Sequence, residues 1–155
     1  MARSAVRPFV AATLVAGTLD ILAAIGLTLF YGRRSVAEML RYVASGPFPP
    51  ATEWGTAGAA LGLLVHFALM AAMVAVFLVA ARRIPPLWQK PLLWGTLYGL
   101  ATYAVMNLLV VPLRWPAAFP PSTRGIVTQL FCHIVLVGIP IALIAARHFR
   151  RRPFG

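Results

Sequence analysis

The chain has 155 residues, of which 61% are hydrophobic and 11% are charged. Soluble domains carry about 25% charged residues, so this composition excludes a soluble globular protein. The formal net charge of +11 would favour a nucleic-acid ligand in a soluble protein. Here the basic residues lie at the ends of long apolar segments, where they meet lipid headgroups. We therefore predict contact with a lipid bilayer and no binding of nucleic acid.

Four apolar segments are each long enough to cross a bilayer, which requires about 20 mostly apolar residues in helical conformation. They cover residues 8–31, 56–81, 92–113 and 126–146. The loops between them are short, and short loops place consecutive helices side by side in opposite directions. The predicted fold is all-α, a single four-helix transmembrane bundle with antiparallel neighbours.

The first segment contains Asp20, the most costly residue in the chain. An ionised Asp in the middle of a span costs about 2.5–3.5 kcal/mol. Asp20 must therefore be protonated, or it must pair with a cation or a strong hydrogen-bond donor. The segment exceeds the apolar core of about 7–15 residues found in signal peptides, so we expect it to remain as a membrane anchor.

The first loop, residues 32–55, contains an apolar pattern of its own. Val36, Met39, Leu40 and Val43 follow the i, i+3, i+4, i+7 spacing of an amphipathic helix. We expect a short interfacial helix on the outer side of the membrane. A solvated loop helix is the alternative.

The second and third segments share a pattern in which paired glycines precede polar residues at four-residue spacing. Residues spaced by four lie on one helix face, and Gly-x-x-x-Gly pairs let helix backbones approach closely. The polar side chains are therefore expected to point into the bundle. The predicted packing glycines are Gly58 and Gly62, followed by His66, and Gly95 and Gly99, followed by Tyr103 and Asn107.

The fourth segment contains His133 next to Cys132, the single cysteine of the chain. One cysteine excludes an intrachain disulfide. Pro112 lies near the end of the third segment and Pro140 lies inside the fourth. Because proline lacks an N–H and clashes with the preceding helical turn, we expect each of them to kink or end its helix.

Estimated depths group the intramembrane polar residues into two layers. At 1.5 Å per residue, Asp20, His66 and Tyr103 lie about 15–16 Å below the outer boundary. Asn107 and His133 lie about 9–10 Å below it. Together they predict the wall of a water-accessible cavity or a proton path. Alternatively, Asp20 and His66 form a structural pair that fixes helix register, and the other polar residues hold helices together.

The basic residues also predict the orientation through the positive-inside rule. Of the fourteen, nine lie in the N-terminus, the second loop and the C-terminus, and five lie in the first and third loops. Both termini are therefore expected in the cytoplasm.

No complete catalytic, nucleotide-binding or metal signature is present in the sequence. His66 and His133 lie on different segments, as axial haem ligands would, and together with Asp20 they have ligand types that suit a divalent ion. No ligand spacing typical of either site accompanies them. We predict no metal, no cofactor and no catalytic residue.

One motif in each apolar segment carries a family resemblance. The motifs are Gly17-Thr18-Leu19-Asp20, Gly62-x-x-x-His66-Phe67, Tyr103-x-x-Met106-Asn107-x-x-Val110-x-Pro112 and His133-x-x-x-Val137-Gly138-x-Pro140. As a set they resemble a family of small uncharacterised bacterial membrane proteins with four helices, a domain of unknown function. The resemblance implies a multi-pass protein of the bacterial inner membrane and carries no activity.

The polar residues favour small-solute or proton-linked transport. Asp20 and His66 would be the proton-linked pair, Tyr103 their hydrogen-bond partner, and Asn107 with His133 an outer vestibule. The alternative is a non-catalytic accessory or assembly subunit of a larger membrane protein complex. An enzyme with a buried lipid or quinone substrate ranks third. The expected partners are lipid, a second copy of the chain, or another membrane protein.

Overall fold

The computed structural model describes residues 5–32 and 34–150. Residues 1–4, 33 and 151–155 lie outside the described residues. They include Arg3, Arg33, Arg151 and Arg152, which contribute to the predicted orientation. The described ranges are helical and contain no strand.

Four helical spans are long and apolar enough to cross a membrane, as predicted. Their outward side chains are apolar, with Phe30 81% and Leu113 76% exposed, as expected of a surface that faces lipid. The first two spans are α1 (Val6–Tyr31) and α3 (Gly55–Arg83). The third consists of α5 (Pro91–Tyr103), η2 (Ala104–Val110) and α6 (Val111–Arg114), and the fourth of α7 (Thr123–Phe131), η4 (Cys132–Gly138) and α8 (Ile139–Arg150).

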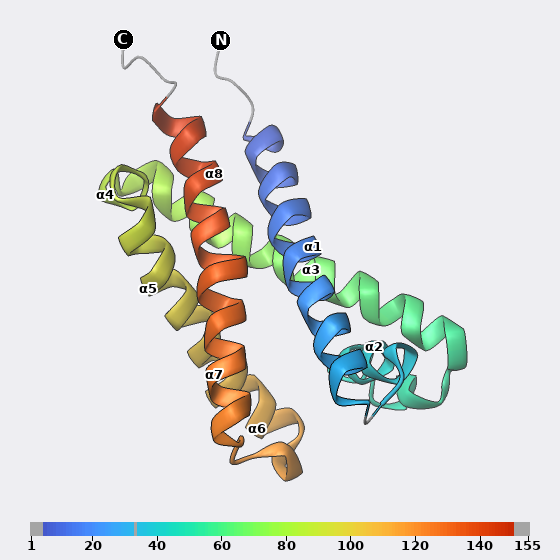
Figure 1. The fold of residues 1–155 in the computed structure, drawn as a ribbon. Coiled ribbons are helices and arrows are strands. Elements are labelled where there is room, and N and C mark those ends of the chain that lie inside the picture. Colours follow the sequence, from blue (N-terminus) through green and yellow to red (C-terminus); the bar gives the residue numbers. More distant parts are fainter. Residues whose placement is uncertain (1–4, 33, 151–155) are drawn as a thin grey trace.

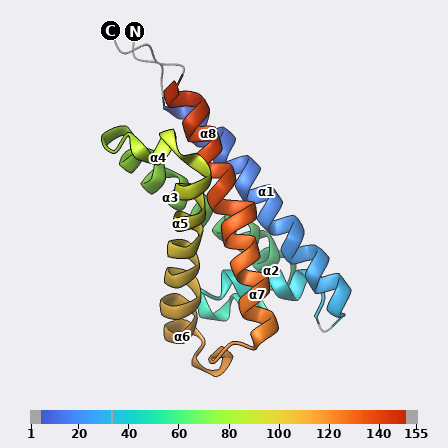
Figure 2. The same cartoon turned by 60° about the vertical axis from the view of Figure 1, so that its left-hand side comes forward.

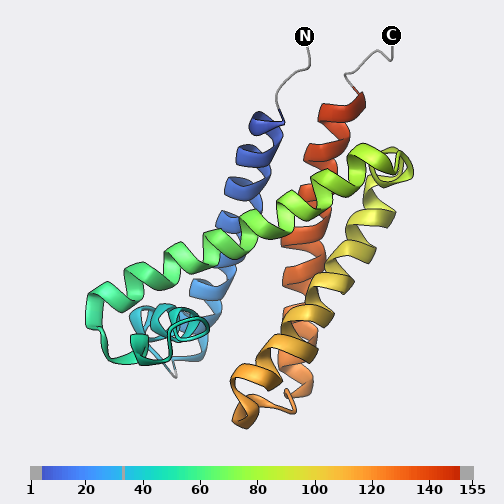
Figure 3. The same cartoon turned by 180° about the vertical axis from the view of Figure 1, so that it is seen from behind.

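The connections contain four short elements, which are α2 (Val36–Ala44), η1 (Pro49–Glu53), α4 (Pro86–Gln89) and η3 (Pro116–Ala118). The N-terminal end of α1, the C-terminal end of α8 (called the termini below) and α4 lie at one end of the molecule, and α2 and α6 lie at the other (Figure 1). The first and fourth spans are close near the termini and diverge toward the opposite end (Figures 1 and 2). Seen from behind, α3 crosses both of them diagonally (Figure 3).

The main hydrophobic core lies in the half of the molecule that carries the termini. Its buried side chains come from the first half of α1, the second half of α3, Leu87 of α4, and the fourth span. Small residues let these helices approach closely: Ala12, Ala16 and Ala81 are fully buried, as are Ala142 and Ala145. We call this half the packed half. The other half, where the first and fourth spans diverge, contributes none of its described side chains to this core, and we call it the open half.

The third span packs against the fourth rather than along the second. Gly99 faces the backbone of His133 and Ile134, and Gly138 faces the backbone of Gly95. A side chain at any of these glycines would overlap the facing helix. Because glycine has none, the two backbones can come into contact. Contacts between α5 and α3 are more local, as between the Tyr98 hydroxyl and the Met73 carbonyl at 2.6 Å. The close glycine contacts explain why chain neighbours are not the closest helix pair.

The first loop folds back onto the second span. Gly62 lies against the carbonyl of Leu40 in α2, and Gly58 lies against the carbonyl of Ala51 in η1. The predicted short helix is present and begins with a capping box, in which Ser35 and Glu38 bond to each other's backbone N–H. The Gly58 and Gly62 face of α3 is thus covered by the same chain.

A group of contacts fastens α2 to the third span; we refer to it as the Arg114–Trp115 clasp. Arg114 donates hydrogen bonds to the carbonyls of Ser45 and Gly46, at 2.6 and 2.8 Å. The Trp115 indole donates to the Ser45 hydroxyl at 3.3 Å and stacks on Tyr42, with ring centres 4.6 Å apart. The clasp joins the two diverging sides at the end opposite the termini.

Neither of the two prolines ends its span. Pro112 and Pro140 each follow a π-helical stretch, η2 and η4 respectively. In η2, for example, the Val111 N–H donates to the Met106 carbonyl, an i to i+5 bond. The wider π turn accommodates the missing N–H and the ring of the proline, so the helix continues beyond it.

Candidate functional site

Each of the four spans contributes one side chain to an intramembrane polar cluster, which we define as Asp20, His66, Tyr103 and His133. These residues lie beside the core on the same helix faces. Asp20 follows the buried Ala16 by four residues, and His66 and His133 precede the buried Met70 and Val137 by four. The cluster therefore lies where the packed half of the molecule meets the open half.

The two ring nitrogens of His66 face two groups of α1, which are the Gly17 carbonyl and the Asp20 carboxyl group. Its Nε2 lies 2.9 Å from the Gly17 carbonyl oxygen, and its Nδ1 lies 3.9 Å from Asp20 Oδ2. The side chains of His66 and Asp20 are 11% and 24% exposed. The next residue, Phe67, packs over Gly17, where a Cβ would fall 2.6 Å from its ring. The absence of a side chain at Gly17 thus lets α3 approach α1 closely enough for this contact.

The Gly17 carbonyl determines where the His66 proton is held. A carbonyl oxygen only accepts hydrogen bonds, so Nε2 must carry a hydrogen. In the neutral ring, Nδ1 is then the basic nitrogen, and it is the atom that faces Asp20. One proton can move between the Asp20 carboxyl group and Nδ1 without changing the net charge of the pair.

His133 has the opposite arrangement of ring nitrogens. Its Nδ1 lies 2.9 Å from the Gln129 carbonyl, so Nδ1 carries the hydrogen and Nε2 is the acceptor in the neutral ring. Its ring meets Tyr103 edge to face, with centres 5.9 Å apart. Asp20 interacts electrostatically with both His66 and His133. The cluster therefore connects all four spans.

His133 contacts Tyr103, although the estimated depths place these two residues in separate layers. The fourth span begins at Thr123, three residues before the predicted start at Ile126. At 1.5 Å per residue, that difference moves His133 to about 15 Å below the boundary. Asn107 lies in η2 one turn above Tyr103, and its amide donates to the Tyr103 carbonyl at 3.4 Å.

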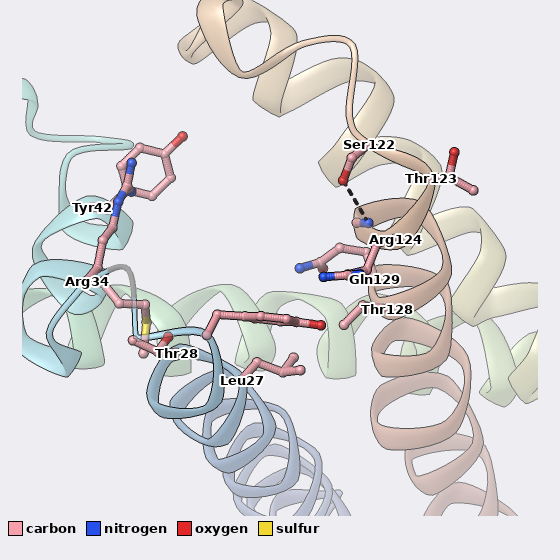
Figure 4. Close-up of a pocket in the computed structure, with 12 residues that line it drawn as sticks. Leu27, Thr28, Arg34, Tyr42, Ser122, Thr123, Arg124, Thr128 and Gln129 are labelled. Atoms are coloured by element: carbon pink, nitrogen blue, oxygen red, sulfur yellow. Dashed lines mark hydrogen bonds between the residues drawn. The ribbon is translucent and has the colours of Figure 1, made fainter.

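A cleft of about 770 Å³ opens between α1, α2 and α7 in the diverging half. Figure 4 shows Arg34 and Tyr42 on one wall and Arg124 and Gln129 on the other. Gln129 precedes His133 by four residues, so the lining continues toward the polar cluster along one helix face. The remaining lining residues are Leu27, Thr28, Tyr31, Met39, Ser122, Thr123, Gly125 and Thr128.

Two parts of this arrangement are absent from the sequence-based prediction. The first is the Gly17 carbonyl, because a backbone acceptor leaves no residue signature. The second is the cleft. The sequence analysis uses its two arginines only to predict the orientation, because nothing in the sequence indicates that they lie close together. A proline inside a long apolar segment, as at Pro112 and Pro140, is the sequence feature that accompanies the two π-helical stretches.

Within residues 5–32 and 34–150, no three side chains of His, Cys, Asp or Glu gather as they would around a metal ion. Comparisons with known proteins add no assignment: no family model, no curated protein and no solved structure matches this chain.

Proposed function

We propose that this protein is a small proton-linked transporter of the bacterial inner membrane, with the Asp20–His66 pair as its proton-exchanging site. One observation carries the proposal. The Gly17 carbonyl holds the His66 proton on Nε2, and the basic Nδ1 is left facing Asp20 at 3.9 Å. A pair that only locked two helices together would be better served by a direct hydrogen bond of about 2.7–2.9 Å.

The chemistry of the pair suits a low-dielectric site. With the proton on Asp20, both side chains are neutral; with the proton on Nδ1, they form an ion pair. Both states have zero net charge, which limits the cost of placing ionisable groups in the membrane. Taking up a further proton makes the pair cationic, and the cleft that ends at Gln129, four residues before His133, is the proposed route to water.

The open half supplies access from one side, and the core closes the other side. Transport then requires the helices to move relative to one another. The π-helical stretches η2 and η4 lie in the two spans that carry Tyr103, Asn107 and His133. Such stretches recur at functional sites, and they provide backbone that can change its hydrogen-bond register beside the cluster.

Proton flux into liposomes that contain the purified protein and an internal pH-sensitive dye tests this function. Under an imposed pH gradient and a potassium–valinomycin potential, we expect flux with the wild-type protein. Asp20→Asn should reduce it to the level of protein-free liposomes, because the amide cannot accept the proton. Glu53→Gln is the matched control, since Glu53 is an exposed acid in η1, and it should retain full flux.

Undiminished flux in folded Asp20→Asn would exclude the pair as the proton site. If the wild-type protein shows no flux and copurifies with a stoichiometric membrane partner, the accessory-subunit alternative replaces transport.

The proposed orientation places both termini in the cytoplasm and α2 at the outer membrane interface. A reporter active only in the cytoplasm should be active when fused after Gly155 or inserted within residues 84–89. It should be silent within residues 46–50 or 116–121, two sites at the opposite end. Activity at both of those sites would reverse the orientation and turn the cleft toward the cytoplasm.

A further inference from the structure

We infer that the cleft between α1, α2 and α7 is a binding site for a phosphate group, presented by the headgroup of an anionic phospholipid. This inference is independent of proton transport. It rests on two arginines that face a common space from opposite walls, on the neutral polar groups around them, and on the position of the cleft at the ends of the spans.

The two arginines of the cleft are positioned by aromatic rings. The Arg124 guanidinium carbon lies 5.6 Å from the centre of the Tyr31 ring, and that of Arg34 lies 5.2 Å from the centre of the Tyr42 ring. A cation over the face of an aromatic ring is attracted by the π-system and spends no N–H hydrogen bond on it, so the guanidinium donors stay available to other groups. In the part of the chain that the structure describes, neither guanidinium donates a hydrogen bond to another residue.

Other arginines have a structural role, which separates them from this pair. Arg114, at the same end of the molecule, uses its donors on the carbonyls of Ser45 and Gly46. At the opposite end, Arg150 donates to the Gln89 carbonyl at 2.8 Å. Arg34 and Arg124 are thus the cationic side chains of the cleft whose donors can serve a ligand.

The cleft carries positive charge with little compensation. None of its twelve lining residues is acidic. Glu38 attracts Arg34, but it lies outside the cleft and accepts the Ser35 N–H at 2.6 Å; this bond and the nearby Arg41 and Arg34 hold the pKa of Glu38 below its usual range. Burial raises the pKa of Tyr42, so its hydroxyl stays neutral and can donate. Arg124 has no such acidic neighbour among its cleft partners.

The remaining lining suits a tetrahedral oxyanion that is attached to an apolar chain. Ser122, Thr123 and Gly125 belong to the start of α7, where the helix dipole adds partial positive charge. The Gly125 N–H already donates to the Ser122 hydroxyl oxygen at 3.1 Å (Figure 4), so the donors left for a ligand are the hydroxyl groups of Ser122 and Thr123. Arginine pairs well with phosphate oxygens through two parallel bonds. Leu27 and Met39 line the same cleft, and its volume of about 770 Å³ is in the range of small-molecule sites. A phospholipid would use both, with its phosphate against the positive charge and its acyl chains against the apolar surface, whereas free phosphate would use only the charge.

The test measures thermal unfolding and native mass spectra of the detergent-solubilised full chain with three probes. They are dihexanoyl-phosphatidylglycerol, dihexanoylglycerol, which lacks the phosphate, and inorganic phosphate. We expect saturable binding of the phosphatidylglycerol, with retention of one molecule, and none of dihexanoylglycerol. Arg34→Gln and Arg124→Gln should each weaken this binding about tenfold or more. Arg83→Gln removes one exposed charge at the opposite end and should leave it unchanged.

The outcomes separate the sources of the phosphate. If inorganic phosphate binds as tightly as the lipid and competes with it, the site takes free phosphate and the headgroup assignment is wrong. The site is overturned if wild type and Arg34→Gln/Arg124→Gln bind phosphatidylglycerol equally. It is also overturned if neither phosphatidylglycerol nor inorganic phosphate binds to the wild-type protein. Should the glutamine variants unfold, Arg34→Lys/Arg124→Lys keeps the charge, and weaker lipid binding at unchanged stability then supports the site.

Discussion

Replacing His66 by alanine should destabilise the protein far more than replacing Asp20 by asparagine. His66→Ala removes the nearer histidine partner of Asp20, at 3.9 Å, and leaves a carboxyl group in the low-dielectric region with only the more distant His133 to compensate it. Removing one partner of a buried pair costs about 3–5 kcal/mol. Since the Asp20 side chain is 24% exposed, we expect the lower end, about 3 kcal/mol. Asp20→Asn leaves a neutral amide opposite a neutral imidazole and should cost about 1 kcal/mol.

The two substitutions should also be strongly non-additive. Once Asp20 is an amide, removing His66 leaves no uncompensated carboxylate, so Asp20→Asn/His66→Ala should be more stable than His66→Ala alone. The measurement is a double-mutant cycle from thermal or denaturant unfolding in detergent. Additive effects, or a His66→Ala variant with wild-type stability, would show that the two side chains do not form an energetic pair.

Gly62→Leu should produce the second large loss of stability, about 3 kcal/mol or more. Any Cβ at this position overlaps the carbonyl of Leu40, and backbone atoms of a packed helix cannot yield as a flexible side chain can. The substitution should therefore separate α2 from α3. Thermal unfolding measures the loss, and the detergent-solubilised mass of the remaining folded protein should not change.

Gly26→Leu is the matched control, because no atom lies within 4 Å of a Cβ built there. It should be neutral or mildly stabilising, since leucine has a higher helix propensity than glycine by several tenths of a kcal/mol. A Gly62→Leu protein of normal stability whose mass falls to that of the monomer would instead assign this face to a contact between copies.

The sequence predicts the spans well because a bilayer demands long apolar helices, and composition alone reveals them. The proximity of Asp20 and His66 is also predictable, since both spans begin and end close to the expected residues. The estimated depth of His133 is in error by about one turn, because the fourth span begins three residues earlier than its apolar segment. The residues at this start, including Ser122 and Thr123, are polar, so hydropathy does not include them in the span. Boundary errors become depth errors at 1.5 Å per residue.

The order in which the spans pack is harder to infer from sequence. Gly58-x-x-x-Gly62 and Gly95-x-x-x-Gly99 have the same pattern. The first pair packs against the backbone of the first loop, and the second pair packs against the backbone of the fourth span. A glycine pair therefore predicts that another backbone segment packs closely there, but it does not predict which segment. The cleft is also invisible in the sequence, since Arg34 and Arg124 meet through tertiary structure across ninety positions of chain.

The Arg114–Trp115 clasp has a consequence for biogenesis. Its acceptors, Ser45 and Gly46, emerge from the ribosome well before its donors, with a separation of 68 to 70 positions between bonded residues. During synthesis, α2 can dock on α3 as soon as the second span is inserted, but its C-terminal end stays unfastened until the third span follows. This end of the molecule is therefore completed late, and a chain arrested before Trp115 would leave the C-terminal end of α2 without the hydrogen bonds that fasten it.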